Sequence, residues 1–224
     1  MTTAVLVLII AVLFSYFLGS VSFAVVFSRA FSHKDVRDYG SGNAGMTNVL
    51  RSVGVLPGVL TFLCDFLKGV AAVLIGRYLI FAFADPMGII IPEYTAFFCG
   101  MACQLGHIFP VFYGFRGGKS VSTSVAILFM IDWRAGLIAI LTFALMLIIT
   151  KIVSASSIVG ALTAPFSLWF LLSGSHPETI VAEVLLCAWI VAVLVVAHWQ
   201  NIGRIFRGEE KKLEIKKSAP SGDK

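Results

Sequence analysis

The chain has 224 residues, of which 58% are hydrophobic and only 13% are charged, and its formal net charge is +5. Its mean hydropathy of +0.95 lies well outside the range of soluble domains, so a soluble globular protein is excluded. In so apolar a chain, a basic excess is more typical of the cytoplasmic loops of a membrane protein than of a nucleic-acid-binding surface. We therefore expect membrane lipid, and no nucleic acid, as a partner.

Long apolar runs predict the membrane spans, because a helix of about 20 apolar residues crosses a bilayer core about 30 Å thick. In chain order the runs cover residues 4–27, 56–82, 93–112, 120–131, 135–150, 152–172 and 178–198. The fourth run is short, which leaves six crossings plus a re-entrant segment as the alternative. The sequence predicts an all-α polytopic membrane protein, a bundle of seven transmembrane helices.

Basic residues are concentrated in alternate loops, and this asymmetry predicts the orientation. The opposite loops hold little beyond Arg77 and Arg134. We expect the basic side to be cytoplasmic, with the N-terminus outside and the C-terminus inside. Residues 1–210 form a single transmembrane domain, and residues 211–224 form a charged cytoplasmic tail. The basic loops hold Arg29, Lys34, Arg37, Arg51, Arg116, Lys119 and Lys151, and the basic C-terminal segment begins at Arg204.

Three polar segments, residues 40–51, 106–120 and 198–204, interrupt the apolar pattern on the predicted cytoplasmic side. Their glycines allow successive backbone amides to converge on an anion, while Ser, Thr, Asn, Arg and Lys add donors and positive charge. This composition is typical of phosphate binding. Residues 40–45 also fit G-x-G-x-x-G, but no buried strand precedes them. Tyr113 stands where a P-loop needs glycine, so a nucleotide-binding fold is not expected.

The polar residues of these segments are the candidate ligand-binding groups. In the third segment, His198 and Asn201 share a helix face because they are three residues apart. The alternatives are plain turns for the glycines, a helix cap for His107, and an interfacial histidine with an asparagine cap for His198 and Asn201. The first two segments contribute Ser41, Gly42, Asn43, Gly45, Thr47, Asn48, Arg51, His107, Gly117, Gly118, Lys119 and Ser120.

Two charged residues, Asp65 and Lys68, lie inside the second predicted span. An isolated charge at that depth costs several kcal/mol unless it is paired or hydrated. Because the two are three residues apart, we predict that they pair with each other. A contribution to a polar cleft below the first loop is the alternative.

In their order and spacing, the three segments closely resemble the bacterial integral-membrane, acyl-phosphate-dependent glycerol-3-phosphate acyltransferases of the PlsY type. The resemblance rests on residues 40–51, 106–123 and 198–209 and extends over nearly the whole chain. It implies transfer of a fatty acyl group from acyl phosphate to the 1-hydroxyl of glycerol 3-phosphate, giving lysophosphatidic acid and phosphate. This reaction begins phospholipid synthesis and uses no cofactor.

The resemblance also implies a location and site residues. It places the enzyme in the bacterial cytoplasmic (inner) membrane, with its active site on the cytoplasmic side and the acyl-phosphate-producing enzyme as a candidate partner. Ala44, Met46 and Ala197 depart from the family pattern, but they flank the polar positions. No metal is expected, because the segments hold no carboxylate cluster. By resemblance, catalytic roles fall on Ser41, Arg51, Lys119, His198 and Asn201, and substrate-binding roles on Gly42, Asn43, Gly45, Thr47, Asn48, His107, Gly117, Gly118 and Ser120.

The implied chemistry needs no enzyme nucleophile, because acyl phosphate is already activated by its leaving group. Ser41 then serves as a hydrogen-bond donor, and the base is either His198 or a phosphate oxygen of the substrate. The alternative functions are a membrane carrier for an organic phosphate and a non-catalytic scaffold. A carrier should continue its polar residues through several spans, and only Asp65 and Lys68 clearly do so.

Overall fold

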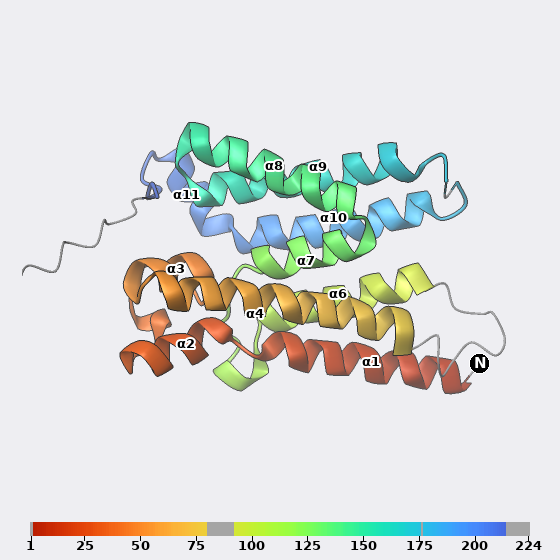
Figure 1. Cartoon of the computed structure of the whole chain (residues 1–224), viewed down its shortest axis with the longest axis horizontal. Coiled ribbons are helices and arrows are strands. Elements are labelled where there is room, and N and C mark those ends of the chain that lie inside the picture. The colour runs from red at the N-terminus through yellow and green to blue at the C-terminus, as the bar shows by residue number, and fades with distance from the viewer. Residues whose placement is uncertain (1, 80–91, 176, 214–224) are drawn as a thin grey trace, which may run out of the picture.

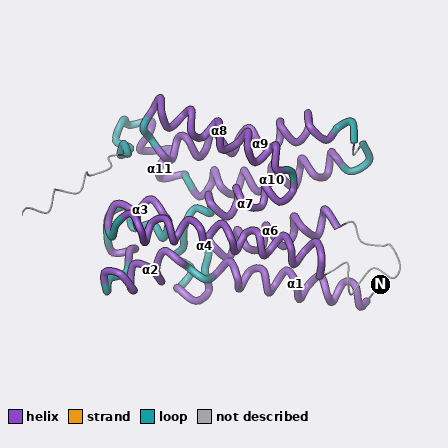
Figure 2. The backbone as a smooth tube through the Cα atoms, viewed as in Figure 1, coloured by secondary structure: helices purple, strands orange, loops and turns teal. Residues whose placement is uncertain are grey.

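The computed structural model describes residues 2–79, 92–175 and 177–213, and its regular structure over these residues is entirely helical (Figures 1 and 2). Two short 3-10 turns, η1 (Val36–Asp38) and η3 (Val111–Tyr113), lie in the loops, and a π-helical turn, η2 (Ile75–Leu79), extends α4. The helices are α1 (Thr2–Ser20), α2 (Phe23–Ser32), α3 (Met46–Ser52), α4 (Val55–Leu74), α6 (Pro92–Ile108), α7 (Val121–Ile131), α8 (Trp133–Thr150), α9 (Val153–Leu172), α10 (Ile180–Ala197) and α11 (Trp199–Phe206).

Six stretches of the described chain are long and apolar enough to span a membrane, which confirms six of the predicted runs. The remaining predicted run, residues 120–131, corresponds to α7, which has only 11 residues. At 1.5 Å per residue it reaches about 16 Å, roughly half of a bilayer core. The described N-terminal and C-terminal ends of the chain lie at opposite ends of the bundle (Figure 1).

The helices form two layers with α7 between them: α1, α2, α4 and α6 on one side, and α8, α9 and α10 on the other (Figure 1). Backbones approach very closely between α1 and α6. A Cβ atom added to Gly19 would collide with the Cys103 carbonyl, and one added to Gly106 would collide with the Tyr16 carbonyl. Small residues therefore permit this packing, as is common in membrane bundles.

The first span is broken, although the sequence predicted one helix over residues 4–27. The α1 helix ends at Ser20 and α2 begins at Phe23. The Lys68 Nζ atom of α4 donates to the carbonyl oxygens of Gly19 (3.0 Å) and Val21 (2.9 Å) at this break. These bonds give polar partners to carbonyls that the break leaves without a full set of helical hydrogen bonds.

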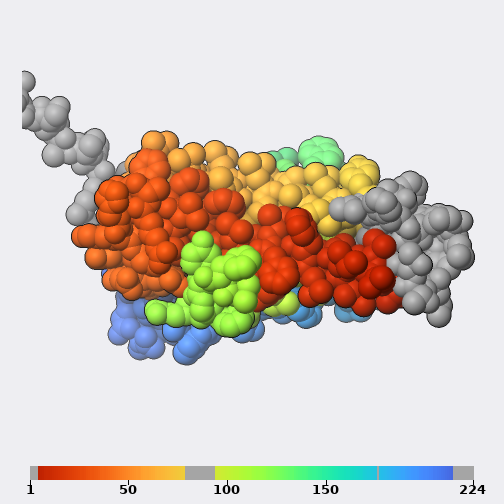
Figure 3. Space-filling model, turned by 90° about the horizontal axis from the view of Figure 1, so that it is seen from below, coloured from red at the N-terminus to blue at the C-terminus, as the bar shows by residue number. Residues whose placement is uncertain are grey.

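The segment that follows α6 folds back against α1. The Tyr16 hydroxyl donates to the Phe109 carbonyl (2.8 Å), and the rings of Phe17 and Phe112 lie 6.0 Å apart. Figure 3 shows the segment as a green protrusion beside the red and orange surface of α1 and α2. Its position places the following glycines, Gly117 and Gly118, against the end of α6.

Candidate active site

The first polar segment is shaped by one buried side chain, Asn48 of α3. Its Nδ2 atom donates to the carbonyl oxygens of Val36 (2.9 Å), Tyr39 (3.0 Å) and Asn43 (3.1 Å). Its Oδ1 atom accepts from the Ser41 amide at 3.1 Å. Asn48 thus fixes the loop and leaves Ser41 exposed at its surface.

In the second segment, Gly117 and Gly118 cross the end of α6 in contact with its backbone. The Gly117 amide donates to the Ile108 carbonyl (3.2 Å), and the Gly118 amide donates to the His107 carbonyl (3.1 Å). A Cβ atom at Gly118 would also lie 2.5 Å from the Ala44 carbonyl oxygen of the first segment. Only glycine fits at this contact, which joins the first two segments directly.

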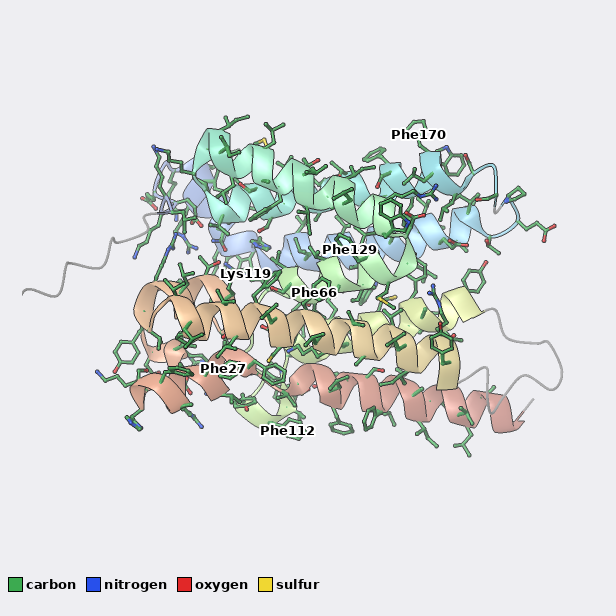
Figure 4. The ribbon with its side chains drawn as sticks, viewed as in Figure 1. Phe27, Phe66, Phe112, Lys119, Phe129 and Phe170 are labelled. Carbon is green, nitrogen blue, oxygen red and sulfur yellow. The ribbon has the colours of Figure 1, made fainter. Side chains whose placement is uncertain are left out.

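Lys119, next to these glycines, lies between the two layers of the bundle (Figure 4). Burial lowers the pKa of Lys119 to about 8; the nearby Glu210 carboxylate opposes this shift, and Arg204 and Arg51 add to it. Arg204 and Arg51 are therefore both electrostatic neighbours of Lys119. The three cations belong to three different polar segments, which indicates that these segments converge.

The third segment places His198 at the junction of α10 and α11, where its side chain is buried. Its Nδ1 atom lies 2.8 Å from the Leu194 carbonyl oxygen. Because a carbonyl only accepts, Nδ1 carries the proton and the neutral ring keeps a lone pair on Nε2. Burial lowers the pKa of His198 to about 4, a shift that the Leu194 carbonyl opposes and the Lys119 charge reinforces.

Glu210, which was not among the predicted site residues, lies against the third segment. Oε1 accepts from the Ser154 hydroxyl (2.7 Å) and the Asn201 amide, and Oε2 accepts from Arg204 Nε at 2.7 Å. Gly208 explains the position: with φ +72° it reverses the chain after α11. Its amide donates to the Ile205 carbonyl and the Glu209 amide to the Arg204 carbonyl, the two bonds of a Schellman motif. Gly208 is the sequence signal for this reversal, because glycine readily adopts positive φ at the end of a helix.

The segment after Glu210 also contacts both layers. Arg51 Nη2 donates to the Lys212 carbonyl at 3.2 Å, and the Leu213 amide donates to the Lys151 carbonyl at 2.7 Å. The start of the predicted tail therefore packs on the bundle, and residues 214–224 of that tail lie outside the described residues.

Two buried polar atoms near this junction, Asn201 Oδ1 and Ser120 Oγ, have no hydrogen-bond partner among the described residues. An unpaired buried polar atom costs about 1–3 kcal/mol, so such atoms are suited to ligand contacts. Among the described residues, the electrostatic neighbours of Lys119 are two cations, Arg51 and Arg204, and one carboxylate, Glu210, so the site has the charge to bind an anion. Contacts between substrate and any of these residues stay predictions. The same holds for His107 and for the first-segment residues Ser41, Gly42, Asn43, Gly45, Thr47 and Asn48.

The chain is similar in sequence to glycerol-3-phosphate acyltransferases. Residues 9–208 match the family model described as Glycerol-3-phosphate acyltransferase. A glycerol-3-phosphate acyltransferase of Photobacterium profundum is 40% identical over 215 residues, covering 95% of each chain. One from Chromobacterium violaceum is 38% identical over 219 residues, covering 98% of this chain and all of the relative.

Two solved structures are also similar to the chain. The crystal structure of PlsY, an integral membrane glycerol 3-phosphate acyltransferase, in its glycerol 3-phosphate form is 33% identical, with a TM-score of 0.78. The match covers 92% of this chain and 96% of that one. The lysophosphatidic acid form gives 32% identity and a TM-score of 0.77, with coverage of 93% and 96%.

Proposed function

Because the chain belongs to the glycerol-3-phosphate acyltransferase family, and is an integral-membrane acyltransferase of phospholipid synthesis, we propose that its acyl donor is acyl phosphate. The observation that carries this proposal is the convergence of Lys119, Arg51 and Arg204. Acyl phosphate and glycerol 3-phosphate are both anions, and bringing them together requires more than one cation.

The proposed reaction is a direct transfer. The 1-hydroxyl oxygen of glycerol 3-phosphate attacks the acyl carbon, and the bond from that carbon to the phosphate oxygen breaks. Lysophosphatidic acid and inorganic phosphate are released. Lys119 and Arg51 offset the repulsion between the substrates, and the Gly117 and Gly118 region with Ser120 holds a phosphate. Ser41 donates a hydrogen bond, and Asn43, Thr47 and the adjoining glycines Gly42 and Gly45 line the same anion site.

The proton of the attacking hydroxyl passes to a substrate phosphate oxygen in this proposal. With its pKa lowered to about 4, His198 is a weaker base than a phosphate monoester, whose second pKa is about 6. The neutral Nε2 atom of His198 and the Asn201 Oδ1 atom then remain as acceptors for the other hydroxyl of glycerol 3-phosphate, which orients the substrate.

We place this site on the cytoplasmic side of the bacterial inner membrane, with the N-terminus outside and the C-terminus inside. The basic residues of the α2 to α3 loop, Lys151 and the C-terminal segment support this orientation. In this proposal α7, although short, makes the seventh crossing. A cytoplasmic site also gives access to the enzyme that produces acyl phosphate.

Donor competition tests the proposal. Purified protein in detergent is supplied with glycerol 3-phosphate and one of three donors: acyl phosphate, acyl coenzyme A or acylated acyl carrier protein. Lysophosphatidic acid and phosphate are then measured. We expect equimolar products from acyl phosphate alone. Transfer from a thioester without acyl phosphate would overturn the donor assignment, and uptake of labelled glycerol 3-phosphate into proteoliposomes without acyl transfer would favour the carrier.

A further inference from the structure

Three ionisable side chains, Lys68, Asp65 and His107, form a buried cluster beneath the glycines of the second segment; we call it the buried triad. Lys68 Nζ lies 2.8 Å from Asp65 Oδ1, which confirms the predicted pair, and His107 Nδ1 lies 3.4 Å from the same oxygen. All three side chains are at most 7% exposed.

Stability alone does not account for the triad. Well-packed apolar side chains can replace a buried ion pair with no loss of stability, and charges inside a membrane are costly. The sequence alone left open whether Asp65 and Lys68 contribute to function. Their contacts in the structure provide the evidence.

The His107 ring lies between Asp65 and residues 117–118, which we call the glycine linker. A Cβ atom on Gly118 would collide with His107 Nε2, while the Gly118 amide is bonded to the His107 carbonyl. The ring and the backbone carbonyl of His107 thus together fix the position of this linker. Lys119 is the next residue, so the same contacts decide where its ammonium emerges.

Asp65 is also connected to the chain on the other side of Lys119. The Thr123 hydroxyl, in the first turn of α7, donates to the Asp65 carbonyl at 3.1 Å. The segment that carries Lys119 is therefore anchored to one point of α4 both before and after the lysine. Lys68 extends the connection to the α1 break through the Gly19 and Val21 carbonyls.

We propose that the buried triad is a set of positioning residues that holds the glycine linker, and through it Lys119, in the register required to bind a substrate phosphate. In this proposal His107 acts through the glycine linker, in place of the substrate contact that the resemblance implies. The kinetic part of this proposal rests on the proposed function, whereas its structural part does not.

Hydrogen exchange of the Gly117 and Gly118 amides tests the structural part without any substrate. The full-length protein in detergent is compared with His107→Asn and with the double variant Asp65→Asn/Lys68→Gln, which leaves no unpaired buried charge. We expect exchange in residues 114–120 to become at least fivefold faster, with α8 to α10 unchanged. Unchanged exchange in the folded double variant, or equal acceleration throughout the bundle, would overturn the proposal.

Steady-state kinetics of the same variants test the functional part. A displaced phosphate site should raise the KM for glycerol 3-phosphate at least tenfold, while kcat falls less than threefold. A loss of kcat in proportion to the folded fraction, with KM unchanged, contradicts a positioning role. If the chain used another acyl donor, the exchange result and the KM for glycerol 3-phosphate would still decide this proposal.

Gln104→Met provides the matched control. Gln104 is fully buried one turn before His107 on α6, and its Nε2 atom donates to Ser124 Oγ (3.1 Å) and the Ile190 carbonyl (2.8 Å). The substitution removes a buried polar contact of the same helix away from the triad. We expect a lower melting temperature, with no change in KM or in exchange at residues 114–120; a matching KM increase would make the triad effect nonspecific and overturn the proposal.

Discussion

The two ends of the bundle both contain arginines and carboxylates, yet their charges are arranged differently. At the end away from Lys119, a cavity of about 290 Å³ is lined in part by Arg77, Asp132, Arg134 and Glu183. Asp132 pairs with Arg134 at 2.7 Å and also caps α8. The two arginines and two carboxylates named in this lining balance one another, whereas Lys119 has two further cations, Arg51 and Arg204, and one carboxylate, Glu210, as electrostatic neighbours among the described residues. An excess of one charge therefore marks an anion site better than cavity volume does.

Removing one cation from each end gives the largest expected contrast. Lys119→Ala should lower kcat/KM by roughly 10³-fold, about 4 kcal/mol of transition-state stabilisation, because the phosphates lose a buried positive partner. Arg134→Ala at the other end should change kcat/KM less than twofold. Steady-state assays on both variants check this, and equal losses would remove the functional distinction between the ends.

Two neighbouring glutamates, Glu210 and Glu209, differ in their contacts and should differ in their effect on activity. Glu210→Gln weakens the contacts to Asn201 and Arg204 and should lower kcat/KM by roughly 10- to 100-fold, about 1–3 kcal/mol. Glu209 pairs only with Arg207 on the surface among the described residues, so Glu209→Gln should have less than a twofold effect. The idea fails if the two variants have the same activity in the transferase assay.

The pH dependence distinguishes the buried lysine from ordinary surface cations. Because burial lowers the pKa of Lys119 to about 8, its ammonium is present below that pH and lost above it. We expect kcat/KM to fall about tenfold per pH unit above this value, since kcat/KM reports ionisations of free enzyme and free substrate. Lys119→Arg should remove this alkaline limb even if its rate is lower, and a limb that persists in the variant would rule out Lys119 as its source.

The smallest expected effect on activity is at the end of the bundle that holds the cavity lined by Asp132 and Arg134. Asp132 accepts from the backbone amides of Arg134 and Ala135, so Asp132→Ala removes a helix N-cap as well as an ion pair. The free energy of unfolding should fall by about 1 kcal/mol, measured by thermal denaturation, while kcat/KM stays unchanged. A loss of activity without a loss of stability would show that this end takes part in function.

Hydropathy and local spacing predicted much of this molecule, because membrane helices and an i, i+3 pair are local properties. The six long spans and the pairing of Asp65 with Lys68 follow directly from them. The break near Val21 was not predictable in this way, since Lys68, which donates to the Val21 carbonyl, lies on another helix. Glu210 was missed for a related reason: its position depends on the chain reversal at Gly208.

The ion pair within α4 has a consequence for how the protein is made. Since ammonium and carboxylate lie on adjacent turns of the same helix, their mutual neutralisation requires no other helix. A nascent α4 can therefore partition into the bilayer as a segment of zero net charge, before α1 and α6 have packed around it. When α1 packs against α4, the carbonyls at its break can bind the Lys68 ammonium, which is already paired with Asp65. The same two side chains therefore contribute both to membrane insertion and to helix packing.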